Sequence, residues 1–81
     1  MNSIAVAGNI VPPIYHLILE KGYEIKWKGE YIVAAKEDIE LKAYDLIELG
    51  AIVFLYENKG LNWKVNDDKI DDCLMFLEKK K

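Results

Sequence analysis

The sequence predicts a small α/β domain of the α+β kind, with a mixed sheet of about four strands in the order β-α-β-β-β-α-α and helices packed on the sheet. Two observations predict this class. The first third of the chain shows a short apolar run, a Gly-Asn break, an apolar-periodic segment and an alternating segment, which is the pattern of a βαβ unit. Alternating runs joined by short polar turns then predict a β-meander.

The βαβ unit begins with a strand expected over Ile4–Ala7, which Gly8 and Asn9 interrupt. A helix is expected over Pro12–Lys21, because proline suits the first turn and apolar side chains recur at helical spacing. Gly22 can take a positive φ and end the helix. A right-handed crossover then makes the first strand parallel to the next one.

The meander consists of three strands expected over Tyr23–Lys28, Tyr31–Ala35 and Ile39–Ala43. In the first, apolar and charged residues alternate, so that one face is buried and the other is wet, and Ile39–Ala43 alternates again. The intervening turns are short and polar, as hairpin connections are.

The segment between Asp45 and Gly60 has two interpretations. Ile52–Tyr56 is rich in β-favouring residues and could form a buried strand. The favoured alternative is a helix over Leu46–Lys59, because Asp45 and Glu48 have the spacing of a capping box and Gly60 has the position of a C-terminal stop. Gly50 costs such a helix about 1 kcal/mol relative to alanine, so its place there suggests a close approach by a neighbour.

The last element is a helix expected from Asn66 or Asp67 to about Lys79, after a connector over 61–65. Aspartates crowd its first turns, where the helix dipole favours anions. Its apolar stripe is expected to pack in the core and consists of Ile70, Cys73, Leu74 and Leu77.

Length and composition indicate one domain over residues 1–81 that lies in the cytosol. There is one cysteine, no signal-peptide pattern and no apolar run long enough to cross a membrane. The net charge of −3 disfavours binding to nucleic acid or to acidic lipids. Hydrophobic residues make up 52%, and this surplus either fills a tight core or forms a face that docks on a second copy, giving a homodimer, or on another protein.

The nearest approach to a ligand site is the strand end at Gly8 and Asn9. The loop lacks the glycines of a dinucleotide site and the Gly-Lys-Ser/Thr of a P-loop, so a plain chain turn is the favoured interpretation. If a small molecule binds, His16 or the pair Tyr44 and Asp45 would line its site. His16 is more simply an exposed helical residue, because no nucleophile accompanies it.

No metal site, cofactor or catalytic residue is predicted. One cysteine and one histidine cannot form a zinc site, and the aspartates after Asn66 lack the spacing and glycine of a calcium loop. Cys73 is expected to be buried and inert on the apolar stripe of the last helix.

Aromatic side chains are the candidates for an interface. Trp63 follows a helix end in a polar connector, beside Asn62 and Lys64, where partial exposure is expected. Phe54 and Tyr56 are the further interface candidates, although core packing is the alternative for all three aromatic residues.

Several segments together resemble a loose group of small uncharacterised bacterial α/β proteins. They are Ala7-Gly8-Asn9 with Pro12-Pro13, Asp45-Leu-Ile-Glu-Leu-Gly50, and Tyr56-Glu-Asn-Lys-Gly60 with Trp63. The resemblance implies a single α/β domain and supports the helix after Asp45. It implies no activity and no site.

The expected function is therefore that of a small non-enzymatic binding module, dimeric or bound to another protein. One specific form is an acidic antitoxin or immunity-type protein that covers a basic partner. The alternative is a small-molecule-binding or catalytic domain with its site near Gly8 and Asn9.

Overall fold

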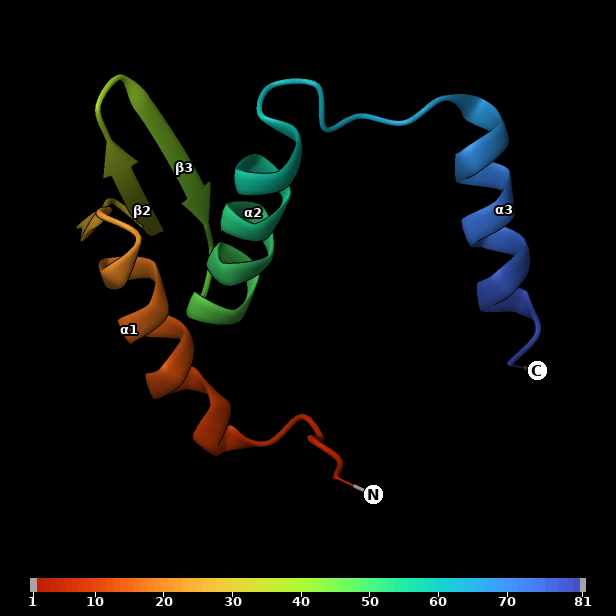
Figure 1. Cartoon of the computed structure of the whole chain (residues 1–81), viewed down its shortest axis with the longest axis horizontal. Coiled ribbons are helices and arrows are strands. Elements are labelled where there is room, and N and C mark those ends of the chain that lie inside the picture. The colour runs from red at the N-terminus through yellow and green to blue at the C-terminus, as the bar shows by residue number, and fades with distance from the viewer. Residues whose placement is uncertain (1, 81) are drawn as a thin grey trace.

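The structure, a computed structural model, describes residues 2–80 as an α+β domain with a further helix beside it (Figure 1). A single-turn 3₁₀ helix precedes the first α-helix, and three strands lie between the first two α-helices. The elements are η1 (Gly8–Ile10), α1 (Val11–Glu20), β1 (Glu24–Lys28), β2 (Tyr31–Lys36), β3 (Ile39–Ala43), α2 (Leu46–Lys59) and α3 (Asp67–Glu78).

The sheet is an antiparallel meander in the order β1-β2-β3, as the alternating runs predict. Trp27 of β1 pairs with Ile32 of β2, which pairs in turn with Ala43 of β3. Gly29 has φ 64° in the β1–β2 turn, where the left-handed region favours glycine.

The helices α1 and α2 cover one face of this sheet, and the core lies between them and the strands (Figure 1). Ile32 and Ala34 of β2 contribute to this core, whereas Val33 between them is fully buried outside the cluster. The buried cluster consists of Ile18, Tyr23, Ile32, Ala34, Leu41, Ala43, Leu49 and Val53.

The helical prediction for the segment after Asp45 is confirmed, with α2 spanning Leu46–Lys59. The Asp45 side chain accepts a hydrogen bond from the Glu48 N–H at 2.8 Å, and the Tyr44 N–H donates to Glu48 Oε1 at 3.0 Å. These two bonds form the predicted capping box. The alternative of a strand over Ile52–Tyr56 is therefore wrong.

The predicted strand over Ile4–Ala7 is wrong: this segment carries no strand, and the sheet of the described residues has three strands instead of four. No parallel pair or right-handed crossover forms, so the predicted βαβ unit is wrong too. The two alanines of the segment favour strands weakly and bury little surface. Ile4 and Val6 remain 94% and 81% exposed.

The helix α3 begins at Asp67, within the predicted range, but it stands apart from the rest of the domain (Figure 1). Every residue from Leu61 to Lys80 is exposed, so the predicted burial of the α3 stripe is wrong. The radius of gyration is 15.0 Å. A compact domain of this length has a radius of gyration of about 12 Å, and the separated helix accounts for the difference.

Candidate functional site

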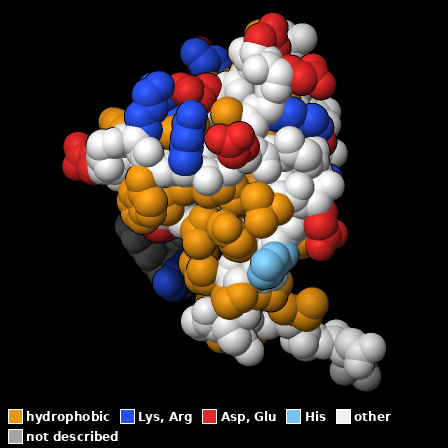
Figure 2. All heavy atoms as spheres, turned by 90° about the vertical axis from the view of Figure 1, so that its left-hand side faces the viewer, with side chains coloured by type: hydrophobic (Ala, Val, Ile, Leu, Met, Phe, Trp, Pro, Cys, Tyr) orange, Lys and Arg blue, Asp and Glu red, His pale blue; other side chains and the backbone are white. Residues whose placement is uncertain are grey.

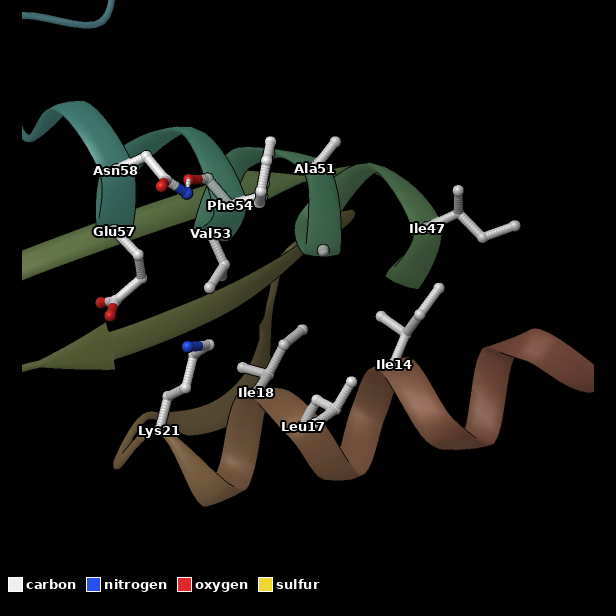
Figure 3. A pocket seen from close by; sticks show the side chains of 11 residues that line it. Ile14, Leu17, Ile18, Lys21, Ile47, Ala51, Val53, Phe54, Glu57 and Asn58 are labelled. Atoms are coloured by element: carbon white, nitrogen blue, oxygen red, sulfur yellow. Dashed lines mark hydrogen bonds between the residues drawn. The ribbon is translucent and has the colours of Figure 1, made fainter. Parts of the chain in front are cut away.

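An apolar groove runs between α1 and α2 on the surface of the domain (Figure 3). We call it the α1–α2 groove. Its volume is about 260 Å³, slightly below the range of about 300–1,000 Å³ for pockets that take a small molecule. It is lined by Ile14, Leu17, Ile18, Lys21, Ile47, Gly50, Ala51, Val53, Phe54, Glu57 and Asn58.

The groove is shallow because α1 and α2 approach closely at Gly50. A Cβ atom on Gly50 would lie 2.8 Å from Ile14 Cγ2, which is too close for two carbon atoms. The predicted role of Gly50, to admit a neighbour, is confirmed. Leu17, Ile47 and Phe54 are left on the two walls of the groove, and they are 56%, 45% and 67% exposed.

Both helices run in the same direction along the groove. Ile14 and Ile47 lie at one end, and Lys21 and Glu57 lie at the other (Figure 3). This second end therefore carries a cation on the α1 wall and an anion on the α2 wall. The rest of the lining carries no charge.

Neighbouring groups favour the ionised form of the Glu57 carboxyl. The Tyr23 hydroxyl donates to Glu57 Oε2 at 2.6 Å, and this bond lowers the pKa of the carboxyl, with further lowering by Lys36 and Lys21. Burial, together with the same hydrogen bond, raises the pKa of the Tyr23 hydroxyl above its usual range. The bond ties the segment before β1 to the end of α2.

A second apolar groove lies on the other side of α2, where the connector to α3 leaves the domain. We call it the α2–connector groove; its volume is about 270 Å³. The chain's own connector supplies part of its wall. It is lined by Leu41, Ile52, Leu55, Tyr56, Leu61 and Trp63.

The third apolar surface is the stripe of α3, which has no contact partner in the described part of the chain. Ile70, Leu74 and Leu77 are 44%, 53% and 58% exposed. An isolated helix of this length is marginal in water, and most helical stability in proteins comes from packing of an apolar face. The free stripe is thus the feature of this molecule that most requires a partner.

Exposed apolar side chains also gather on the side of the domain that carries the single histidine, His16 (Figure 2). Exposed apolar residues of α1 and β1 include Tyr15, Leu19 and Trp27. Lysines and acidic side chains border this area at its upper edge (Figure 2).

The predicted ligand residues fall on two separate features. Gly8 and Asn9 belong to η1 and are exposed, and His16 lies on α1 with its ring 5.2 Å from that of Tyr15 in a T-shaped arrangement. None of these three residues lines either of the two apolar grooves. A small-molecule site at this end of α1 stays a prediction.

The other predicted pair, Tyr44 and Asp45, has a structural role. Asp45 caps α2, and the Tyr44 ring stacks on that of Tyr31, with centroids 5.0 Å apart. The hydroxyls of these two tyrosines are 3.4 Å apart, and this contact raises the pKa of Tyr44. The Asp45 carboxylate is occupied by the backbone amide of Glu48.

The predicted interface aromatics are divided between the two grooves. Phe54 lies on the wall of the α1–α2 groove, whereas Tyr56 and Trp63 line the α2–connector groove. Trp63 is 46% exposed, as expected, and the Lys64 ammonium lies 5.6 Å from its ring centroid.

The sequence-based interpretation missed Leu17 and Ile47 as surface residues. A signal was present: α2 is apolar on more than one face, since Ile47, Phe54 and Leu55 lie outside the stripe that packs on the sheet. A helix that is apolar all round needs cover on all sides.

Cys73 is exposed, so the prediction that it is buried is wrong. The physical reason is the position of α3, whose stripe the domain does not cover. In residues 2–80, no group of three His, Cys, Asp or Glu side chains is arranged to hold a metal ion. None of the helices described is both long and apolar enough to cross a membrane.

Comparison of the chain with protein-family models, with curated proteins and with solved structures gave no match. The resemblance to small bacterial α/β proteins therefore stays a prediction.

Proposed function

We propose that this protein is a non-enzymatic protein-interaction module whose binding element is α3. One observation carries the proposal. The apolar stripe of α3, with Ile70, Leu74 and Leu77 at 44–58% exposure, is presented on a helix that the domain does not cover. Recognition of an amphipathic helix by a groove uses anchors at such i, i+4 and i+7 positions.

The gain from covering the stripe is large on the scale of binding. Full burial of one Leu or Ile side chain contributes about 1.5–3 kcal/mol. Because the three anchors are already about half buried, covering them contributes about half of this amount each, which offsets part of the cost of association of about 4–15 kcal/mol.

Site-specific photo-crosslinking tests the proposal. A diazirine amino acid placed at position 74 of the full chain, in cells of the source organism, is expected to form an adduct with a second polypeptide. The matched control is the same group at position 75, because Met75 lies about 100° further around the helix, away from the stripe.

The proposal predicts a high adduct yield at position 74 and a low one at position 75. Equal yields at the two positions, or no adduct at either, would contradict it. The mass of the adduct also shows whether the second polypeptide is another copy of this chain or a different protein.

A further inference from the structure

We propose that the α1–α2 groove binds α3 of a second copy of this chain, and that two copies exchange α3 reciprocally. The inference rests on the proposed function and names its partner.

The stripe and the groove have matching lengths. From Ile70 to Leu77 the stripe is about 10 Å long, at 1.5 Å per residue. The α1 wall of the groove, from Ile14 to Lys21, has the same length, and both surfaces are apolar apart from one end of the groove.

The charges beside the stripe differ between its two flanks. A helix turns by about 100° per residue, so Asp67 and Glu78 lie on one flank of the stripe. Lys69 lies on the other flank. The helix thus has an acidic edge and a basic edge. The charged end of the groove likewise has a basic wall, with Lys21, and an acidic wall, with Glu57.

Only one direction of α3 along the groove matches these charges. If α3 runs in the same direction as α1 and α2, right-handed helix geometry places Glu78 on the α1 side, next to Lys21. The reverse direction brings Asp67 to Glu57 and Lys69 to Lys21, which are pairs of like charge.

In this matching direction the connector is too short for α3 to occupy the groove of its own chain. Asp67 would have to lie at the Ile47 end of α2, about 20 Å along the axis from its C-terminal end. The connector up to Asn62 remains at the C-terminal end of α2, because the Asn62 N–H donates to the Lys59 carbonyl at 3.2 Å. The chain from Asn62 to Asp67 extends about 17 Å at most, so the occupant is the helix of another molecule.

Interface size favours a second copy over a foreign protein that receives α3 alone. Each copy in a reciprocal exchange contributes one face of α3 and the exposed walls of its groove, so that the dimer contains two α3–groove contacts. Two such contacts bring the buried area closer to that of a stable interface than one does. A single α3 in a foreign groove contributes only half as much, and its own groove stays uncovered.

Complementation between two variants tests the exchange. Leu74→Asp disrupts the stripe but leaves the groove intact, and Phe54→Asp disrupts the groove but leaves the stripe intact. Both side chains are more than half exposed, so the domain is expected to stay folded, which circular dichroism checks. Each variant alone is expected to raise the dimer dissociation constant by at least about 100-fold, because an aspartate would be buried in an apolar contact.

A mixture of the two variants is expected to form a dimer of mixed composition in sedimentation velocity, since one intact stripe then meets one intact groove. The controls Met75→Asp and Leu55→Asp add the same charge outside the stripe and outside the α1–α2 groove, and should stay dimeric. A wild-type monomer, a mixture that stays monomeric, or loss of the dimer on Leu55→Asp would overturn the proposal.

Charge reversal tests the direction of α3. Lys21→Glu is expected to weaken the dimer by about 3–10-fold by facing Glu78, and Glu78→Lys in the same chain should restore it. In the reverse direction Lys69 would lie beside residue 21, and Lys21→Glu would strengthen the dimer. Such a strengthening would overturn the proposal.

These results are distinguishable from a failure of the proposed function. A monomeric wild-type chain whose crosslinks at position 74 lead to a different protein would overturn the exchange and leave the interaction module standing. Absence of crosslinks at that position would contradict both.

Discussion

At the scale of single residues, Gly50 has the most specific role in the domain. It admits Ile14 of α1 to the surface of α2, and a Cβ atom at this position would overlap Ile14 Cγ2 at 2.8 Å. The contact sets the separation of the two helices and hence the shape of the α1–α2 groove. A substitution here acts on folding and on the groove together.

We predict that Gly50→Ala destabilises the domain by up to about 2 kcal/mol, because overpacking costs about 1–3 kcal/mol while alanine returns about 1 kcal/mol of helix propensity. In an Ile14→Ala background, where Cγ2 is absent, the same change should become stabilising. Urea unfolding of the four variants in a double-mutant cycle measures this coupling. Equal effects of Gly50→Ala in both backgrounds would contradict the contact.

Glu57 is the residue that connects stability to pH. Its pKa is lowered by the hydrogen bond from Tyr23, so its contribution to stability is present above the ordinary carboxyl value of 4.5. The contribution is lost as pH falls through the lowered pKa of the folded state, because protonation removes the charge that accepts this bond.

We therefore predict that the stability advantage of the wild type over Glu57→Gln is largest at neutral pH and shrinks below about pH 4.5. Urea unfolding across this range measures it, in a Leu74→Asp background so that dimer dissociation does not contribute. Tyr23→Phe should reduce the same pH dependence. A stability advantage over Glu57→Gln that is constant from pH 7 to pH 3 would contradict the claim that the Tyr23 hydrogen bond stabilises the ionised form of Glu57.

At the scale of elements, local chemistry made some predictions accurate. The ends of α2 were predictable because Asp45, Glu48 and Gly60 each have a direct backbone role, which the capping bonds and a φ of 61° at Gly60 confirm. The three strands of the meander were predictable from alternation, since each short turn forces the next strand to pair with the last.

Elements whose state depends on distant contacts were not predictable. Ile4–Ala7 is apolar like a strand, but a strand also needs a paired edge and enough side-chain burial, and periodicity reports neither. The stripe of α3 has the period of a core helix, and the same period serves a helix that binds another molecule. Nothing local distinguishes these two uses.

The candidate sites also divide into those set by local chemistry and those set by distant contacts. Asp45 and Tyr44 are polar residues at an element boundary and could be predicted as special; they take part in the cap of α2, and a ligand role for them stays a prediction. The α1–α2 groove could not be predicted, because it depends on the packing of two helices that are separated by the whole sheet in sequence.

At the scale of the whole molecule, the described part of the chain leaves several apolar surfaces uncovered. The domain leaves apolar walls open on both sides of α2, and α3 carries its apolar stripe away from the domain (Figure 1). The radius of gyration of 15.0 Å reflects this separation. Reciprocal exchange would cover the α1–α2 groove and the stripe at once and convert two extended chains into one compact particle.

Amide hydrogen exchange tests most directly whether α3 is packed against a second copy in solution. At high micromolar concentration, the amides of Ile70–Leu77 in the wild type should be protected to nearly the extent of those in α2, and protection should fall on dilution. In Leu74→Asp the same amides should exchange rapidly at every concentration. Rapid exchange of α3 in the wild type at high concentration, or protection that is independent of concentration, would contradict the claim.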